Sequence, residues 1–250
     1  MIYVYCIVSD DQIHLSDQLR KSLLKFSHHL QILPIYDFNL KNLSKIFKVN
    51  KYFESKNYED DDIIVLADAF DVVCVNNPDK LLLYFETKKI DILISTENMF
   101  GPNFPFIKEY YDNYSSNKGT SNRYPNSGVI IGKAKPLQKF YKNLTDSMPK
   151  LEKFFPPNAT NKTSDQAHII NYLYEIDFVN NKEFKIELDL FDDITFTNTI
   201  IERHFNINDF IFIHTWGIYL KQPEYKHIKD KQYSKWSNIN KYLKLDEVMD

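Results

Sequence analysis

The chain has 250 residues, and its 31 Lys and Arg against 34 Asp and Glu give a formal net charge of −3 at pH 7. Hydrophobic residues at 43% and charged residues at 26% are typical of a globular protein, and the near-neutral balance argues against a nucleic-acid partner. Only five glycines occur, and no Gly-rich phosphate-binding motif is among them. With no internal repeat or linker, we expect one domain over residues 1–250.

The N-terminal segment MIYVYCIVSDD lacks a basic start, and its apolar run is too short for a signal peptide. No stretch approaches the length of a membrane span. We therefore expect a cytoplasmic protein, in the host-cell cytoplasm if the source is a virus, with a secretory compartment left open. Cys6 and Cys74 lie inside apolar runs and are expected to be buried, inert thiols.

Strands and helices alternate along the chain. Apolar runs rich in β-branched residues predict strands, and apolar residues at helical spacing predict helices. The predicted strands are 2–8, 31–35, 63–67, 90–95, 129–131 and 210–213, and the predicted helices are 15–26, 43–53, 78–85, 137–144 and 164–174. The segment 98–125, rich in Pro, Asn and aromatic residues, predicts a long loop that is functional or mobile. This order indicates an α/β domain with a mostly parallel sheet, which binds ligands at the carboxyl ends of its strands.

A pair of carboxylates follows the predicted strand 63–67 directly. Asp68 and Asp71 are three residues apart where the chain leaves the strand and turns, so both can converge on one cation. The alternative is that Asp71 caps a turn and Asp68 pairs with a lysine. We interpret the pair as a candidate site for a divalent metal.

His214 closes the last predicted strand, and we expect it at the same edge of the sheet. A single strand-end histidine is more often structural, but two Asp and one His form a ligand set suited to Mn²⁺. In a chain without a Gly-rich phosphate loop, such a site favours a nucleotide diphosphate whose charge the metal neutralises.

Several short blocks occur in the order and approximate spacing of one family, from the first strand to about Lys221. They are Asp68-Ala69-Phe70-Asp71, Ser95-Thr96-Glu97-Asn98, Pro125-Asn126-Ser127-Gly128-Val129-Ile130-Ile131-Gly132, Asp165-Gln166, Leu188-Asp189 and His214-Thr215-Trp216-Gly217. With these blocks the chain resembles the glycosyltransferase domain of the multifunctional procollagen lysyl hydroxylases and the related stand-alone collagen glycosyltransferases of giant viruses.

The resemblance implies a GT-A fold that binds a UDP-sugar through Mn²⁺ and glycosylates a hydroxyl group of an acceptor. In that pattern Asp68, Asp71 and His214 are the metal ligands. Phe70 stands where the family has a tyrosine that stacks on uracil, so the stacking face is kept and the hydroxyl is lost. Lys45 matches a lysine near the nucleotide.

Further nucleotide contacts are expected from Ser9 in the loop after the first strand and from Gly217 in the His-Thr-Trp-Gly block, which replaces the family's His-Gly-Asn-Gly. Lys221 can approach the diphosphate, although its register is off by one and a surface lysine is the alternative.

Asn126, Ser127 and Gly128 precede a predicted strand, where two polar side chains beside a glycine allow sugar hydroxyls to approach the backbone. The alternative is an ordinary turn. Glu97 is a second strand-end carboxylate, either a ligand of the sugar or a partner of the adjacent loop.

Asp165 is the candidate catalytic aspartate, because it lies where the family has a run of aspartates near the reacting sugar. Here only the last of the run is kept, in Lys162-Thr163-Ser164-Asp165, and a role in the helix dipole is the alternative. Asp189 matches the family's Leu-Asp pair, and Glu97 and Asp189 are the two further catalytic candidates.

The sequence and its resemblance together predict a Mn²⁺-dependent retaining enzyme that moves glucose from UDP-glucose to galactosylhydroxylysine of a collagen-like protein. One alternative is transfer of galactose or N-acetylglucosamine to another protein or glycan hydroxyl. The other is a catalytically silent module that binds a nucleotide sugar, which the thinned aspartate run before Gln166 keeps open. Neither the oligomeric state nor the source follows from the sequence.

Overall fold

The computed structural model describes most of the chain between Met1 and His214. The described residues are 1–9, 13–14, 16–35, 43–69, 71–98, 105–120, 124–156, 158–191, 193–197 and 210–214.

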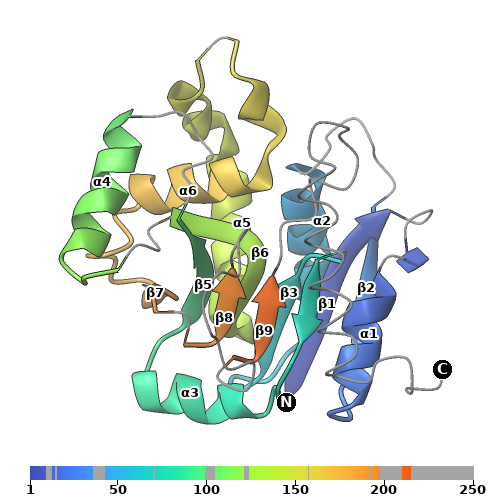
Figure 1. Ribbon diagram of the computed structural model, residues 1–250. Helices are drawn as coiled ribbons and strands as arrows, with labels where there is room; N and C mark the ends of the chain where they lie inside the picture. Colours follow the sequence, from blue (N-terminus) through green and yellow to red (C-terminus); the bar gives the residue numbers. More distant parts are fainter. Residues whose placement is uncertain are drawn as a thin grey trace, which may run out of the picture.

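A six-stranded sheet forms the centre of the molecule (Figure 1). Its strands are, in spatial order, β2 (Leu30–Ile35), β1 (Ile2–Ser9), β3 (Ile63–Ala67), β6 (Tyr124–Lys133), β5 (Ile92–Glu97) and β7 (Ile186–Leu188). The pairs β1–β2, β1–β3 and β5–β7 are parallel, whereas β6 is antiparallel to both of its neighbours. The sheet is therefore mixed and mostly parallel, and the strands other than β6 end at a common edge.

A second, smaller sheet has three short strands. They are β4 (Val72–Cys74), β9 (Phe212–His214) and β8 (Thr195–Thr197), with β9 in the middle. β4 is antiparallel to β9, and β8 is parallel to it. The prediction that His214 ends a strand is confirmed, but that strand belongs to this small sheet and not to the main one. β4, β7 and β8 were not predicted, because three residues carry too little periodicity; β9 is as short, but the apolar run 210–213 marked it.

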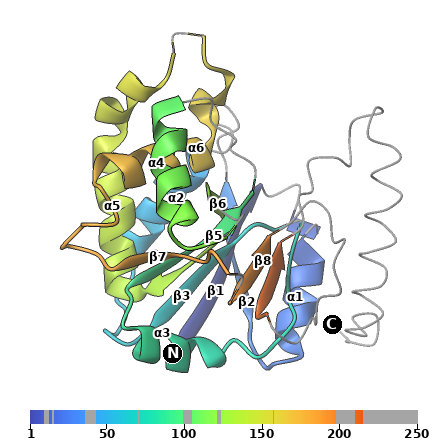
Figure 2. The ribbon, with the colours of Figure 1, turned by 60° about the vertical axis from the view of Figure 1, so that its left-hand side comes forward.

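Helices cover both faces of the main sheet (Figure 2). The described α-helices are α1 (Asp17–Leu24), α2 (Leu43–Glu54), α3 (Lys80–Lys88), α4 (Pro105–Ser116), α5 (Ala134–Leu151) and α6 (Asp165–Glu175). Helices α2, α4, α5 and α6 share one hydrophobic core, and α1 and α3 share the other with the small sheet.

Alternation along the strands divides the main sheet between these two cores. In β3, Ile64 and Leu66 face the α2, α5 and α6 side, whereas Val65 and Ala67 face the other. All five residues of β3 are buried, so this strand is apolar on both faces, as expected for a strand covered on both sides of the sheet.

Segment 98–125 is not a continuous loop, which corrects the sequence prediction. Helix α4 begins at Pro105, a residue favoured at the first helical position, and buries Ile107, Tyr111 and Ser115 on one face. These three positions are four residues apart, but the polar and aromatic residues between them obscured the helical period.

Strand β6 begins five residues before the predicted strand 129–131. Asn126, Ser127 and Gly128 therefore lie inside β6 instead of in a turn before it. The register between β5 and β6 shifts between Ile94 and Thr96, so an irregularity accompanies this polar stretch.

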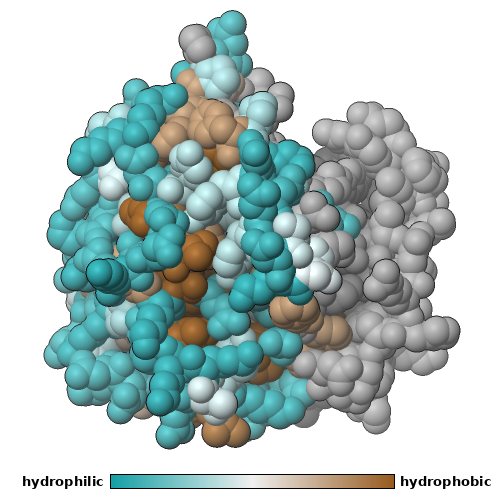
Figure 3. All heavy atoms as spheres, turned by 90° about the vertical axis from the view of Figure 1, so that its left-hand side faces the viewer, coloured by the Kyte–Doolittle hydropathy of each residue, from teal (hydrophilic) through white to brown (hydrophobic). Residues whose placement is uncertain are grey.

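None of the described helices is long and apolar enough to cross a membrane. The face shown in Figure 3 is mainly hydrophilic, and its hydrophobic residues form separate patches.

Candidate metal centre

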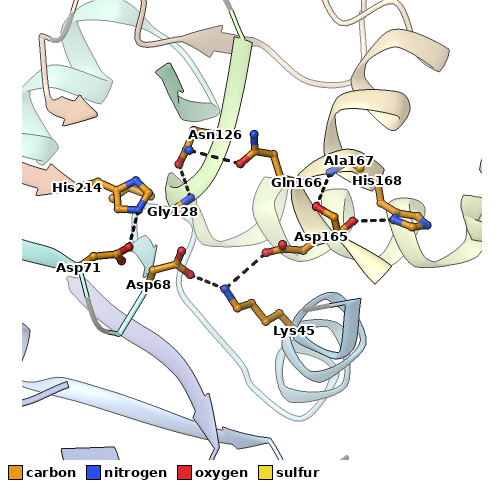
Figure 4. Close-up of polar contacts among 12 residues, drawn as sticks. Lys45, Asp68, Asp71, Asn126, Gly128, Asp165, Gln166, Ala167, His168 and His214 are labelled. Atoms are coloured by element: carbon orange, nitrogen blue, oxygen red, sulfur yellow. Dashed lines mark hydrogen bonds and ion pairs between the residues drawn. The ribbon is translucent and has the colours of Figure 1, made fainter. Parts of the chain in front are cut away.

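Asp68, Asp71 and His214 come together beside the end of β3 (Figure 4). Each residue offers one ligand atom, and these atoms lie within 4.8 Å of one another. His214 Nε2 is 3.4 Å from Asp71 Oδ2. The expected cluster of two carboxylates and one imidazole is therefore present in the described part of the chain.

Two features of the fold produce this convergence. The chain turns between the end of β3 and the start of β4, which places Asp68 and Asp71 at one corner. Across the small sheet, Val72 is paired with His214, so the residue before Val72 lies next to the histidine. The register of β4 on β9, and not the main sheet, delivers the imidazole to the carboxylates.

The His214 ring is buried, with 4% of the residue exposed. Its Nδ1 atom has no hydrogen-bond partner among the described residues. A buried ring nitrogen without a partner costs free energy. The other ring nitrogen, Nε2, is the one beside Asp71.

The site carries more negative than positive groups. Burial raises the pKa of Asp68; the Lys45 ammonium lowers it and the Asp71 carboxylate raises it again, with a net rise. Burial lowers the pKa of His214, but the neighbouring Asp71 outweighs this effect and the pKa is raised. The rise at Asp68 comes mainly from burial, whereas the rise at His214 reflects the carboxylates around the ring. A divalent cation would offset the charge of these carboxylates.

Lys45 on α2 lies between two of the predicted site residues. Its Nζ donates to Asp68 Oδ1 at 2.5 Å and is 3.7 Å from Asp165 Oδ2. Burial lowers the pKa of Lys45, but these two carboxylates outweigh burial, and the net pKa is raised. Lys45 is therefore a cation held at the site by Asp68 and Asp165.

A small cavity of about 20 Å³ adjoins these charges. Its lining includes Lys45, Asp68, Ser127 and Asp165, together with Tyr141 from α5 and five apolar residues. It has room for about one water molecule. Sequence reasoning missed Tyr141, because its position on the apolar face of α5 gives no signal beyond packing.

The amide of Asn126 links β6 to α6. Gly128 N donates to Asn126 Oδ1 at 2.7 Å, Asn126 Nδ2 donates to Gln166 Oε1 at 3.4 Å, and Gln166 Nε2 donates to Glu97 Oε1 at 2.5 Å. Glu97 is 3% exposed. The structure thus joins Glu97 and Asn126 through Gln166, for which the sequence had suggested no role although it follows Asp165.

Asp165 is the first residue of α6, as predicted, and Ser164 caps this helix by accepting a hydrogen bond from Ala167 N. At this position the negative charge of Asp165 complements the helix dipole, as expected. The same position directs the carboxylate towards Lys45.

Asp189 follows β7 and has a different environment. Its carboxylate accepts hydrogen bonds from Asp193 N, Ile194 N, Thr195 N and Thr195 Oγ1, at 2.6 to 3.1 Å. This carboxylate organises the turn that leads into β8. The catalytic role expected for Asp189 from the sequence is not tested by this arrangement, and its hydrogen bonds favour a structural role.

The other predicted nucleotide contacts divide into two groups. Ser9 is the last residue of β1, at the edge where β3 also ends, and Ser127 lines the small cavity. Phe70, Gly217 and Lys221 lie outside the described residues, and their proposed contacts stay predictions.

Residues 43–155 match the family model of the PLOD GT domain. The name PLOD GT domain denotes the glycosyltransferase domain of the procollagen lysyl hydroxylases. The resemblance expected from the sequence is confirmed over these residues. The α/β architecture with its mixed, mostly parallel sheet agrees with the GT-A fold of that domain. No curated protein sequence matched the chain.

The matched segment includes Lys45, Asp68, Asp71 and the Asn126–Gly128 stretch, whereas Asp165, Asp189 and His214 follow it. The assignment of His214 to the metal group therefore depends on geometry. The donor set of two carboxylates and one imidazole fits a divalent cation.

Proposed function

We propose that the protein is a metal-dependent glycosyltransferase that moves glucose from UDP-glucose to galactosylhydroxylysine in a collagen-like acceptor. The observation that carries this proposal is the convergence of Asp68, Asp71 and His214 within 4.8 Å, in a chain that matches the PLOD GT domain. The identity of the metal as Mn²⁺ and of the sugar as glucose belongs to the proposal.

The chain's own residues divide the work. Asp68, Asp71 and His214 would hold the cation, which when bound neutralises the diphosphate and acts as a Lewis acid on the departing UDP. Lys45 supplies a fixed positive charge next to Asp68. Binding requires a neutral imidazole, so His214 must give up any proton that it holds before it can act as a ligand.

Asp165 is the proposed catalytic carboxylate. It is 6% exposed and lies across Lys45 from the metal group, so its charge acts in a site that is partly shielded from water. Glu97 and Asn126, linked through Gln166, are proposed to contact the sugar from the side of β5 and β6. The retaining outcome follows from the family resemblance.

The test is release of free UDP by the purified full chain from UDP-glucose, UDP-galactose and UDP-N-acetylglucosamine. Each donor is supplied with Mn²⁺ or with EDTA, and with or without a galactosylhydroxylysine peptide. We expect turnover of UDP-glucose that requires Mn²⁺ and rises with the peptide. Turnover of another donor would correct the sugar, and binding of UDP without turnover would show a silent module.

A further inference from the structure

Gly128 lies between two of the candidate metal ligands. Its carbonyl oxygen accepts a hydrogen bond from Asp68 N at 2.8 Å, and its own N–H donates to Asn126 Oδ1. On its remaining side lies the ring of His214 (Figure 4). One residue of β6 therefore contacts Asp68, which follows β3 of the main sheet, and His214, which ends β9 of the small sheet.

A side chain at Gly128 would collide with the imidazole. An added Cβ would be 2.1 Å from His214 Cε1, 2.3 Å from Nδ1 and 2.7 Å from Nε2. These separations are far below the van der Waals contact distance of about 3.5–4.0 Å between carbon atoms. Either the ring or the strand must move if any side chain replaces the glycine.

The requirement for glycine is one of space and not of backbone conformation. Among the described glycines, only Gly119 has a positive φ, so the backbone of Gly128 is one that other residues adopt. Both polar backbone groups of Gly128 are paired, and Ser95 secures the same stretch by donating to the Asn126 carbonyl at 3.0 Å. These hydrogen bonds hold β6 in place. If a side chain replaced Gly128, the His214 ring would therefore be the part that moves.

His214 has little freedom to move without loss of its position. It is 4% exposed, and it is paired with Val72 on one side and with Thr197 on the other. A ring displaced from Gly128 takes Nε2 away from Asp71 Oδ2, which is now 3.4 Å away.

We propose that Gly128 is a positioning residue of the metal centre: its missing side chain forms the seat that holds the His214 imidazole beside Asp71. This rests on the proposed metal-dependent function and gives Gly128 a role in it. It also changes the interpretation of the glycine, because the imidazole occupies the space over its Cα in which a donor sugar was expected to approach.

The first test measures Mn²⁺ binding to the purified full chain, with the metal alone and no nucleotide. Gly128→Ala should weaken the affinity by about 10- to 100-fold, the usual range when a group that orients a ligand is lost. Unchanged affinity in a folded Gly128→Ala protein would overturn the proposal.

Gly132→Ala is the matched control. Gly132 lies on the same strand, and an added Cβ there would also be crowded, at 3.1 Å from Asp91 O and 3.2 Å from Leu137 Cβ. It contacts none of the three ligands, so this variant should lose thermal stability but keep its Mn²⁺ affinity. Equal loss of affinity in both variants would show general damage to β6 and overturn the proposal.

A double-mutant cycle with His214→Ala isolates the contact. Removal of the ring frees the space, so Gly128→Ala should cause no further loss of Mn²⁺ affinity or thermal stability in the His214→Ala background. Additive losses would overturn the proposal. If Gly128→Ala alone does not fold, the double variant must fold, and its failure to fold would count against the proposal as well.

These outcomes separate the two proposals. A wild-type chain that binds no Mn²⁺ would overturn the metal site and therefore the function on which the inference rests. A wild-type chain that binds Mn²⁺ no more tightly than Gly128→Ala would overturn the role of Gly128 alone.

Discussion

Asp68 and Asp189 both follow a strand of the main sheet, yet their surroundings differ. Asp68 leaves β3 at a corner where a second carboxylate, an imidazole and an ammonium group converge. Asp189 leaves β7 in a tight turn, where three backbone N–H groups and one hydroxyl donate to its carboxylate. The first aspartate has charged neighbours from distant segments, and the second has polar neighbours from its own turn.

The difference teaches how to interpret a carboxylate at a strand end. The residues that follow Asp189 donate hydrogen bonds to its carboxylate oxygens. The carboxylate therefore stabilises the turn. The oxygens of Asp68 lie near charged groups from α2 and from the small sheet. The Asp68 carboxylate also lies close to the second carboxylate, so two negative charges are near each other. We therefore expect substitutions at the first site to affect metal and nucleotide, and substitutions at the second to affect stability.

The largest expected effect is the loss of metal binding when a candidate ligand is removed. Asp71→Ala should abolish Mn²⁺-dependent UDP release and weaken Mn²⁺ binding by at least about 100-fold, because loss of a ligand costs more than loss of its support. Asp71 is preferred to Asp68 for this test because Asp68 also pairs with Lys45. The control is Asp60→Ala, an exposed carboxylate paired with Lys135, which should bind Mn²⁺ as the wild type does. Normal turnover in Asp71→Ala would disprove the assignment.

Substitution of Asp189 in the turn after β7 should lower the stability of the protein. Asp189→Ala leaves three backbone donors, two of them buried, without an acceptor and should lower the free energy of unfolding by about 2–4 kcal/mol, measured by urea denaturation. Asp193→Ala in the same turn is the control, because its half-exposed carboxylate makes only a 3.7 Å ion pair with Lys88 and should change stability little.

Turnover per folded molecule should persist in Asp189→Ala at low temperature. If instead turnover is lost and stability is unchanged, Asp189 acts in catalysis and the contrast with Asp68 disappears.

Asp165 tests a carboxylate that belongs to the charged site without belonging to the metal group. Asp165→Asn should reduce the rate of UDP release by about 100-fold, a typical loss for a group that acts on the reacting atoms, and leave UDP affinity nearly unchanged. The control is Asp17→Asn, which removes an exposed carboxylate from the first turn of α1. An unchanged rate in Asp165→Asn would move catalysis to another residue.

The smallest effect is a pH dependence at a site removed from both aspartates. Burial lowers the pKa of His168, although the Ser164 carbonyl and the carboxylates of Asp165 and Glu152 oppose this. Below about pH 6.5 the unfolded chain therefore binds more protons than the folded one, and stability falls as the pH decreases.

His168→Gln should reduce this loss, measured from urea midpoints on either side of about pH 6.5. His29→Gln changes an exposed side chain and should leave the pH dependence as in the wild type. If both variants behave alike, the pKa of His168 does not contribute.

Much of the fold follows from local patterns. The continuous apolar run of β3 and the helical spacing in α2 and α6 were predicted close to their observed bounds. Helix α4 was wrongly predicted as loop, because its three buried positions stand among polar residues. Short strands such as β4 fall below the length at which a period is visible.

The candidate site was predictable where it is local. Asp68 and Asp71 lie on one turn, so three residues of spacing after a buried strand were enough to propose a cation site. Gln166 and Tyr141 gave no comparable signal, since their roles depend on which elements pack against them.

The sequence by itself determined the α/β class, the buried central strand and the pair of carboxylates at its end, because these depend on residues that are neighbours along the chain. Only the tertiary structure decided that His214 arrives from a second sheet, that Gly128 leaves room for its ring, and that Asp189 is used by its own turn. Each of these depends on strand register and on the space between side chains, which arise only when segments far apart in sequence pack together.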